Sequence, residues 1–383
     1  MTHLRFGFMS LLLLGGTWRF AHGGASICLP ILAVPALVLL LDALGAEERT
    51  VPSAPWPWVL NGWLFLTLPL MLLQHAVLWW LAGTADPFGL GESVYRLLGQ
   101  DLAAARAATR PWHWLGALPG CALLTAAAAT TVGHELVHRT LKPLHMAWGR
   151  WLLAFTFDTS FAIEHVHGHH ARVSTFEDPA SARRGETVYG FLFRSTWGQL
   201  RSAWQLERRR LERKGLPAFS WHNRFLRGWP MSAALASLAW ALGGPRALLF
   251  FVLSGILGKA VLETINFVEH YGLVRLPGSR VEPRHSWNSN AWLSSTVLYN
   301  LTRHSDHHAE GGKPYWRLQP MPDAPMLPFG YMAMLLLAMV PPLFRALMAP
   351  RLRDWDAGHA SPDERALAAT ETRRSGWTEL LRG

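Results

Sequence analysis

The hydrophobic pattern of the chain consists of long apolar runs, several of which end in histidine-rich polar segments. We expect membrane-crossing helices at residues 6–14, 27–41, 58–81, 112–132, 231–242 and 247–265. The first run is short, and a cleaved signal peptide is the alternative for it. The last two runs are joined by a nearly uncharged Gly-Gly-Pro-Arg link, which suits a helical hairpin. The pattern therefore predicts an all-α integral membrane protein with six transmembrane helices.

The segments between these runs predict a cap on one side of the membrane. Residues 172–229 are rich in arginine and follow the fourth run, so the positive-inside rule places them in the cytoplasm. Counting six spans puts both termini and every histidine-rich segment on that same side. Residues 146–163 are expected to lie on or dip into the membrane, and the proline-interrupted run 326–347 to form a cap or surface helix. We thus expect a membrane domain at 1–355, its cytoplasmic cap formed by about 133–230 and 266–355, and a polar tail at 356–383.

Composition supports a membrane protein and excludes several alternatives. Half of the residues are hydrophobic and only 16% are charged, which is low for a soluble protein. The two cysteines, Cys28 and Cys121, lie in apolar stretches without metal-type spacing, which excludes a built-in rubredoxin, zinc-thiolate or iron–sulfur module. The net charge of +10 is compatible with nucleic-acid binding. Because the basic residues alternate with apolar spans, contact with anionic lipid explains the charge better.

Four short motifs concentrate histidines at the ends of these runs, at 133–139, 164–170, 266–272 and 303–308. Pairs four residues apart share one face of a helix, which is a metal-binding geometry. Together the motifs supply nine imidazoles, enough for two metal ions, and nitrogen-rich sites suit iron, copper, nickel or zinc. The nine are His134, His138, His165, His169, His170, His270, His304, His307 and His308.

Each motif also carries a carboxylate, namely Glu135, Glu164, Glu269 and Asp306. Neutral imidazoles do not offset the charge of two metal ions, so we expect these carboxylates to lie beside the ligands, orient the imidazoles and tune their basicity. The alternative for each is an ion pair with a nearby arginine, and Arg139, Arg172 and Arg303 are the candidates.

The motifs GHELVH (133–138), EHVHGHH (164–170), NFVEHYG (266–272) and RHSDHH (303–308) resemble those of the membrane-bound alkane 1-monooxygenases. The similarity extends through EDPASA (177–182), RHSWNSN (284–290) and LPFGY (327–331), and covers roughly residues 30–355. The spacing of the histidines is shared with membrane desaturases and methyl-group hydroxylases. The chain departs from the family pattern at Arg139, His167, Phe267 and Thr302, and none of these departures removes a ligand position.

The resemblance implies a six-helix diiron enzyme of the bacterial inner membrane, with its site on the cytoplasmic side. Two iron ions held by the nine histidines would use O₂ to hydroxylate the terminal carbon of an alkane. Electrons would come from NAD(P)H through a reductase and a rubredoxin. A hydroxylase of aryl-methyl groups and a fatty acyl desaturase remain alternatives. A metal transporter fits less well, because the histidine clusters lie at span ends instead of within the spans.

An alkane offers no polar group, so its binding must come from apolar burial between the spans. We expect the pocket lining on the second to fourth and sixth spans, although helix packing is the alternative role of the tryptophans. The candidates are Trp63, Leu66, Trp79, Ala129 and Thr130. An acidic rubredoxin would dock on a basic surface, for which a solvated helix face is the alternative. The candidates there are Arg208, Arg209, Arg210 and Arg213.

Overall fold

The computed structural model describes residues 3–51, 56–377 and 380, and its regular elements over these residues are helices. Four stretches are long and apolar enough to cross a membrane, namely Gly24–Leu44, Pro57–Ala82, Pro111–Val137 and Leu226–His270. They contain every predicted apolar run except the first. That run is divided between a 3₁₀ turn (Leu4–Gly7) of 4 residues and α1 (Phe8–Ala21) of 14 residues, which together lie near the lower limit of about 17 residues for a span. The all-α prediction is confirmed.

The fifth and sixth predicted runs form a single bent element, α12 (Trp229–His270). Its two arms meet at Gly244, where φ is 64° and ψ is −153°, a conformation that is essentially confined to glycine. A Cβ atom on the preceding Gly243 would lie 1.9 Å from the backbone oxygen of Trp79, so the bend packs directly against the α3 helix (Pro57–Ala82). The glycine pair therefore allows the chain to reverse its direction within the bundle.

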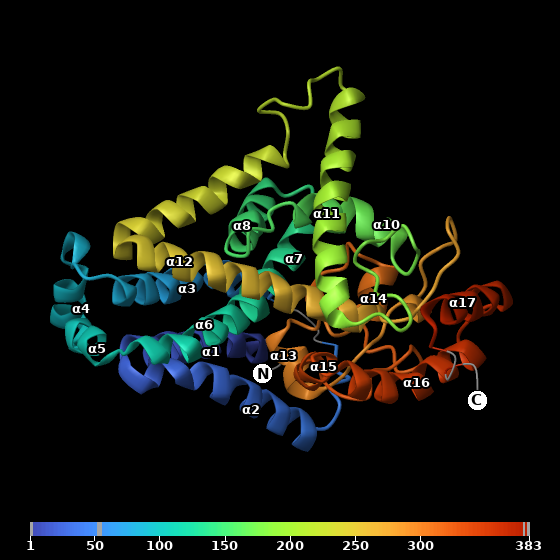
Figure 1. Cartoon of the computed structure of the whole chain (residues 1–383), viewed down its shortest axis with the longest axis horizontal. Coiled ribbons are helices and arrows are strands. Elements are labelled where there is room, and N and C mark those ends of the chain that lie inside the picture. The colour runs from blue at the N-terminus through green and yellow to red at the C-terminus, as the bar shows by residue number, and fades with distance from the viewer. Residues whose placement is uncertain (1–2, 52–55, 378–379, 381–383) are drawn as a thin grey trace.

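The apolar helices lie alongside one another and separate two different ends of the molecule (Figure 1). The bundle consists of α1, α2 (Leu29–Leu44), α3, α6 (Trp114–Thr125) and α12. The short helices α4 (Leu90–Leu98) and α5 (Leu102–Ala108) lie at one end. The opposite end carries α14 (His304–Ala309), α16 (Pro341–Gly358) and α17 (Pro362–Ser375). An apolar core that includes Trp79, Leu124 and Phe251 joins the helices of the bundle.

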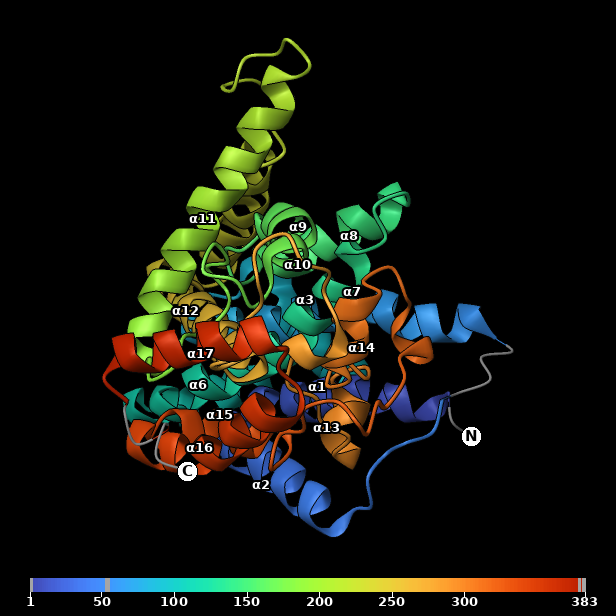
Figure 2. The same cartoon turned by 90° about the vertical axis from the view of Figure 1, so that its right-hand side faces the viewer.

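The 25-residue helix α11 (Val188–Glu212) runs across the direction of the bundle, and its C-terminal part projects from the body (Figure 2). Polar side chains on its inner face form hydrogen bonds with a buried glutamate of α12. Ser195 and Gln199 both donate hydrogen bonds to the carboxylate of Glu263. The same carboxylate also pairs with Lys259, which contacts Asp158. This buried network attaches the projecting helix to the second arm of α12.

The structure divides the two segments that were predicted to cap the bundle or lie in the membrane. Residues 146–163 comprise most of α8 (Pro143–Ala154), an irregular connection and most of α9 (Phe161–Glu164). Residues 326–347 contain α15 (Tyr331–Ala338) and the start of α16. The predicted domain limit at residue 355 falls inside α16, and residues beyond it pack onto the body. Arg184 pairs with Asp356 at 2.5 Å, and His285 hydrogen-bonds Glu364 at 2.8 Å.

Candidate metal centre

The histidine motifs lie on helix ends and short helices that converge at one end of the bundle. The first follows from α6 through a π-helical turn (Ala126–Thr130) into α7 (Thr131–Val137). The second occupies a π-helical turn (His165–His169) and α10 (His170–Arg172), the third ends α12, and the fourth is α14. α14 is held in place by the fully buried Arg303, whose guanidinium donates to the backbone oxygens of Leu318, Glu48 and Thr50.

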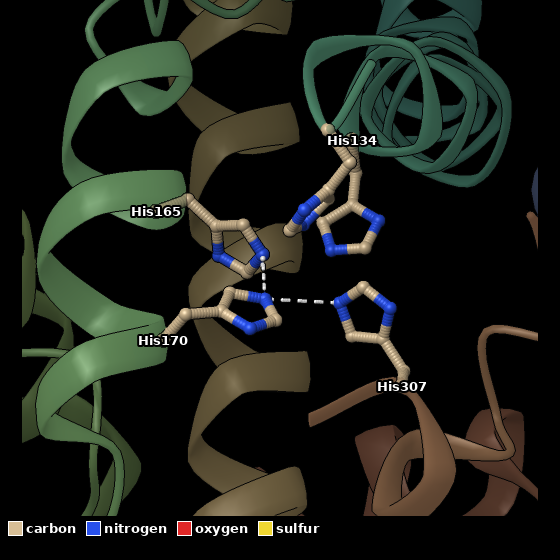
Figure 3. A group of neighbouring side chains, drawn as sticks. His134, His165, His170 and His307 are labelled. Atoms are coloured by element: carbon tan, nitrogen blue, oxygen red, sulfur yellow. Dashed lines mark hydrogen bonds between the residues drawn. The ribbon is translucent and has the colours of Figure 1, made fainter. Parts of the chain in front are cut away.

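The structure brings all nine predicted histidines together in two groups. Within each group the nitrogen atoms that could bind a metal ion lie within 4.8 Å of one another. Figure 3 shows four side chains of the larger group pointing at a common centre. The five-histidine group consists of His134, His138, His165, His170 and His307, and the four-histidine group of His169, His270, His304 and His308.

The second motif contributes to both groups in a way that its spacing did not predict. An α-helix would place His165 and His169 on one face, whereas the π-helical turn has a wider i→i+5 register. His165 therefore shares its group with His170, five residues on, and His169 joins the other group. His167 is exposed and belongs to neither group.

The distances between imidazole nitrogens fit metal ligands. The Nε2 atom of His170 lies 3.2 Å from that of His165 and 3.1 Å from that of His307 (Figure 3). In the other group, the Nε2 of His304 lies 3.2 Å from that of His270 and 3.0 Å from that of His308. Two ligand atoms bound about 2.1 Å from one ion at a right angle lie about 3 Å apart. Both groups thus have the nitrogen spacing of a coordination sphere.

Two further observations support metal binding. The Nε2 atoms of His134 and His138 are buried, and neither has a hydrogen-bond partner among the described residues. Such an atom costs free energy unless it binds something. Burial, followed by the neighbouring imidazoles, lowers the pKa of His307 and His308 well below the usual value. The rings are therefore neutral near pH 7, which is the form that ligates a metal.

Asp178 is the site residue that the histidine spacing did not reveal. Its carboxylate lies 2.8 Å from the Nδ1 atom of His169, so it turns the Nε2 of that ring towards the four-histidine group. Although burial alone lowers the pKa of His169, the charge of Asp178 and its hydrogen bond raise it overall. The residue lies in the EDP sequence that follows the second motif, and that sequence was the only signal for it.

The four predicted carboxylates take different roles. Glu269 alone contacts a ligand ring, with an oxygen 3.3 Å from the Nε2 of His304, and it also accepts a hydrogen bond from Tyr331 at 2.9 Å. The other three pair with cations in largely buried contacts. Two of these cations are arginines considered as the alternative, whereas the partner of Asp306 is a lysine instead of Arg303. The pairs are Glu135 with Arg139, Glu164 with Arg172, and Asp306 with Lys313. Asp306 also accepts a hydrogen bond from the backbone N–H of Gln319.

An apolar cavity of about 940 Å³, counted with its opening, extends from the histidine groups into the bundle. His134, His165 and His304 form part of its wall together with Glu269. The rest of its lining is almost entirely apolar and comes mainly from α1, α2, α6 with its π-helical turn, α12, the α13 segment (Trp292–Val297) and α15. The cavity is therefore an apolar space that ends where the two histidine groups meet.

The predicted substrate residues lie in different places. Thr130 lines the cavity, whereas Trp63, Leu66, Trp79 and Ala129 do not contribute to its described lining. Trp63 hydrogen-bonds the backbone of His3, and Trp79 packs in the core against Phe251. The third span thus packs behind the cavity, and α1 contributes Met9 and Leu12 in its place.

The predicted docking arginines lie at the projecting end of α11. Arg209 and Arg213 are exposed, and Arg208 pairs with Glu212 at 3.2 Å while remaining half exposed. Arg210 differs, because its guanidinium binds the buried carboxylate of Glu207 at 2.6 Å. The structure therefore leaves three of the four arginines available to a partner.

Comparisons with known proteins place these features in a family. Residues 112–375 match the sequence profile of the fatty acid desaturase family. The chain is 41% identical to alkane 1-monooxygenase 1 of Pseudomonas aeruginosa over 90% of its own length and 86% of that protein. It is 42% identical to alkane 1-monooxygenase of Acinetobacter baylyi over 62% of its length and 58% of that protein. It is also 30% identical to the xylene/toluene monooxygenase hydroxylase component of Pseudomonas putida over 98% and 96% of the two chains.

Proposed function

The chain belongs to the alkane 1-monooxygenases within the fatty acid desaturase family, and we propose that it hydroxylates the terminal methyl group of medium- or long-chain alkanes. The observation that supports this substrate class most directly is the apolar cavity that ends at His134, His165 and His304. A substrate without polar groups fits such a cavity. In the reaction, one oxygen atom of O₂ enters the C–H bond and the other leaves as water, which requires two electrons and two protons.

Two iron ions are the proposed cofactor, one for each histidine group, and when bound they would supply the activation of O₂. The residues of the chain orient the metal ligands and bind the substrate. Asp178 fixes the ring of His169, and Arg303 holds the helix that carries three ligands. The cavity contributes about 0.8 kcal/mol of binding for each buried CH₂ group, so the alkyl chain is held along its length. Its apolar wall also excludes water from the reacting carbon.

The proposal includes the position of the protein in the membrane. We infer six spans, in which α1 and the two arms of α12 each count as one, and we place the protein in the bacterial inner membrane. The histidine groups then face the cytoplasm, together with the arginine-rich α11. Support comes from the position of α4 and α5 at the opposite end of the bundle and from the concentration of positive charge near the histidines.

The electron donor is proposed to be a rubredoxin that receives electrons from NAD(P)H through a reductase. An acidic carrier would dock on the exposed Arg208, Arg209 and Arg213 of α11. Reversing the charge of these three residues should lower the apparent affinity for rubredoxin, and raising the salt concentration should reduce the difference between the variant and the original protein. Equal rubredoxin affinities at low salt would contradict this docking site.

The function is tested with purified protein reconstituted with iron, rubredoxin and its reductase. Feeding octane should give 1-octanol, and metal analysis should give two irons per chain. A chain that binds both irons yet forms no terminal alcohol from alkanes of any length would contradict the proposal.

Hydroxylation of an aryl-methyl group is the second candidate, because the chain matches the xylene/toluene hydroxylase component over 98% of its length. Competition between octane and xylene in one reaction separates the two functions. Preferential formation of methylbenzyl alcohol would favour this candidate over the first.

A further inference from the structure

A cluster of arginines beside the start of α12 carries more positive charge than its neighbours neutralise. It consists of Arg150 on α8, Arg210 on α11, and Arg224 and Arg227 in the connection to α12. Glu207 is the carboxylate among them, and it binds Arg210 at 2.6 Å and Arg224 at 2.9 Å. Arg227 is exposed, and the described residues offer it no ion pair. Four guanidinium groups against one carboxylate leave three charges without a counterion.

Arg150 is the member that points most directly to a missing ligand. One terminal nitrogen donates to the backbone oxygen of Arg224 at 2.6 Å, but its Nε atom is buried without a hydrogen-bond partner among the described residues. Burial, then the charges of Arg227 and Arg224, lower its pKa to about 10. An anion beside Arg150 would accept a hydrogen bond from this N–H group and reduce the repulsion between the arginines.

A recess of about 290 Å³, counted with its opening, lies next to this cluster. Aromatic and apolar side chains, including Phe157, Leu200 and Trp229, form much of its wall, and Ser160 and Ser232 add hydroxyl groups. A Cβ atom on Gly228, which also lines the recess, would lie 3.1 Å from a terminal nitrogen of Arg150. The guanidinium therefore borders the recess.

The position of the recess suggests the source of the anion. It lies at the first turn of α12, where a candidate membrane span begins at Leu226. Trp229 is 61% exposed at this turn, and tryptophan is enriched where spans meet the lipid headgroups. A basic pocket beside an apolar recess at this depth suits an acidic phospholipid, whose phosphate meets the arginines while an acyl chain contacts the apolar wall.

We propose that Arg150, Arg224 and Arg227 form a binding site for the phosphate group of an anionic phospholipid such as phosphatidylglycerol. The bound lipid links α8, the connection after α11 and the first turn of α12. Ser160, which lines the recess, is the N-cap residue of α9, and the next turn carries His165. Occupancy of the site thus stabilises the support of the second histidine motif without adding a group to the chemistry.

The test measures thermal unfolding of the iron-loaded full chain in a neutral detergent. Short-chain phosphatidylglycerol should raise the unfolding temperature by several degrees with a saturable dose dependence, and phosphatidylcholine of the same chain length should not. Inorganic phosphate separates the two sources of the anion. If inorganic phosphate raised the unfolding temperature as much as phosphatidylglycerol at the same concentration, the site would be assigned to free phosphate and the lipid proposal would be wrong. No greater shift with phosphatidylglycerol than with phosphatidylcholine would overturn the site itself.

Variants locate the effect on the chain. Arg227→Gln removes an exposed side chain that forms no ion pair with a described residue, so the protein should fold normally and lose at least half of the phosphatidylglycerol shift. Arg150→Gln should lose it almost entirely. The matched control is Arg209→Gln, which removes another exposed arginine from α11 and should keep the full shift. Equal losses in Arg227→Gln and Arg209→Gln would show that general surface charge attracts the lipid, and would contradict a specific site.

Discussion

Asp178 orients a single ring of the centre, and its replacement should separate the two histidine groups functionally. Asp178→Asn keeps the size of the side chain but removes the negative charge that His169 Nδ1 faces at 2.8 Å. We expect the variant to bind iron about 10–100-fold more weakly in the four-histidine group, while the five-histidine group remains filled. Metal analysis after dialysis at increasing chelator concentration measures this, with one iron per chain as the expected plateau.

Glu177→Gln is the matched control, because it changes the adjacent, exposed carboxylate and should retain both irons. Simultaneous loss of both irons in Asp178→Asn would contradict the division into two groups and would indicate a general loss of structure.

His167 and His304 test whether position in the structure, as opposed to membership of a motif, defines a ligand. His304→Ala removes a ring whose Nε2 lies within 3.2 Å of two other ligand nitrogens, so activity should vanish and iron content should fall. His167→Ala removes an exposed ring outside both groups and should leave iron content and turnover within about twofold of the original protein. Loss of iron in His167→Ala would add that residue to the centre.

The convergence of the nine histidines was predictable, but their division into two groups was not. Spacing of four residues in an α-helix reports a shared face, and this holds for His134 and His138 and for His304 and His308. It fails at His165 and His169, because the π-helical turn depends on packing that no local pattern encodes. Asp178 escaped prediction for a similar reason, since its contact with His169 forms across a turn.

At the scale of elements, the bend of α12 depends on the conformation of Gly244. A Cβ atom there would meet no atom within 4 Å, so Gly244→Ala is strained by the backbone alone. With φ at 64° and ψ at −153°, we expect a loss of about 1–3 kcal/mol in unfolding free energy. Thermal unfolding in detergent should show a lower midpoint.

Gly62→Ala provides the comparison, because Gly62 lies in regular α3 helix and also has open space around it. Alanine is favoured over glycine in a helix by about 1 kcal/mol, so this variant should be as stable as the original or slightly more. An equal loss of stability in both variants would contradict the claim that the bend requires glycine at position 244.

The packing of α11 against the start of α12 should weaken at low pH, because it depends on the ionised carboxylate of Glu207. Burial alone raises the pKa of Glu207, but hydrogen bonds from Arg210 and Arg224 lower it to about 2. The folded protein keeps the carboxylate ionised where the unfolded chain, with a pKa near 4.5, already binds a proton. This contribution to stability is complete above a pH of about 4.5 and is lost as the pH falls towards 2.

Glu207→Gln should therefore lower the unfolding free energy by about 1–3 kcal/mol at pH 7, and the difference from the original protein should shrink as the pH falls below 4.5. Glu212→Gln is the control, because Glu212 is 59% exposed in its pair with Arg208 and should have little effect at either pH. A difference between Glu207→Gln and the original protein that stays constant from pH 7 to pH 3 would contradict the assigned pKa.

The long apolar helices followed from the hydrophobic pattern, whereas helices in the polar segments, such as α4, α5 and α17, did not. The long runs predicted α2, α3, α6 and α12, because apolar stretches of this length have few other structures available. The helical character of residues 362–375 was missed, since a polar composition resembles that of a tail. What holds this segment is the pairing of Glu364 with His285 and Arg284.

At the scale of the whole molecule, the cavity arises where α1, α2, α6 and α12 meet α13 and α15, and sequence alone could not show which faces turn towards it. The predicted Trp63 and Trp79 lie on α3, which packs behind the cavity. Met9 and Leu12 line it because α1 lies against the bundle, although the lining was expected on the second to fourth and sixth spans only. Small residues were the better guide, since Ala126, Ala127 and Thr130 all line the space.

The cavity makes substrate length a property of the assembled bundle, and Ala127 is a suitable place to test it. This residue lines the cavity on the π-helical turn and is only half-buried, so a larger side chain extends into space instead of into the core. Ala127→Phe should shorten the longest alkane that is hydroxylated by several carbons and lower its affinity by about 0.8 kcal/mol for each CH₂ group displaced. Product analysis over a series of alkanes measures the limit. Iron content must stay at two per chain, because the histidines are untouched. An unchanged length limit with full iron content would place the alkyl chain elsewhere.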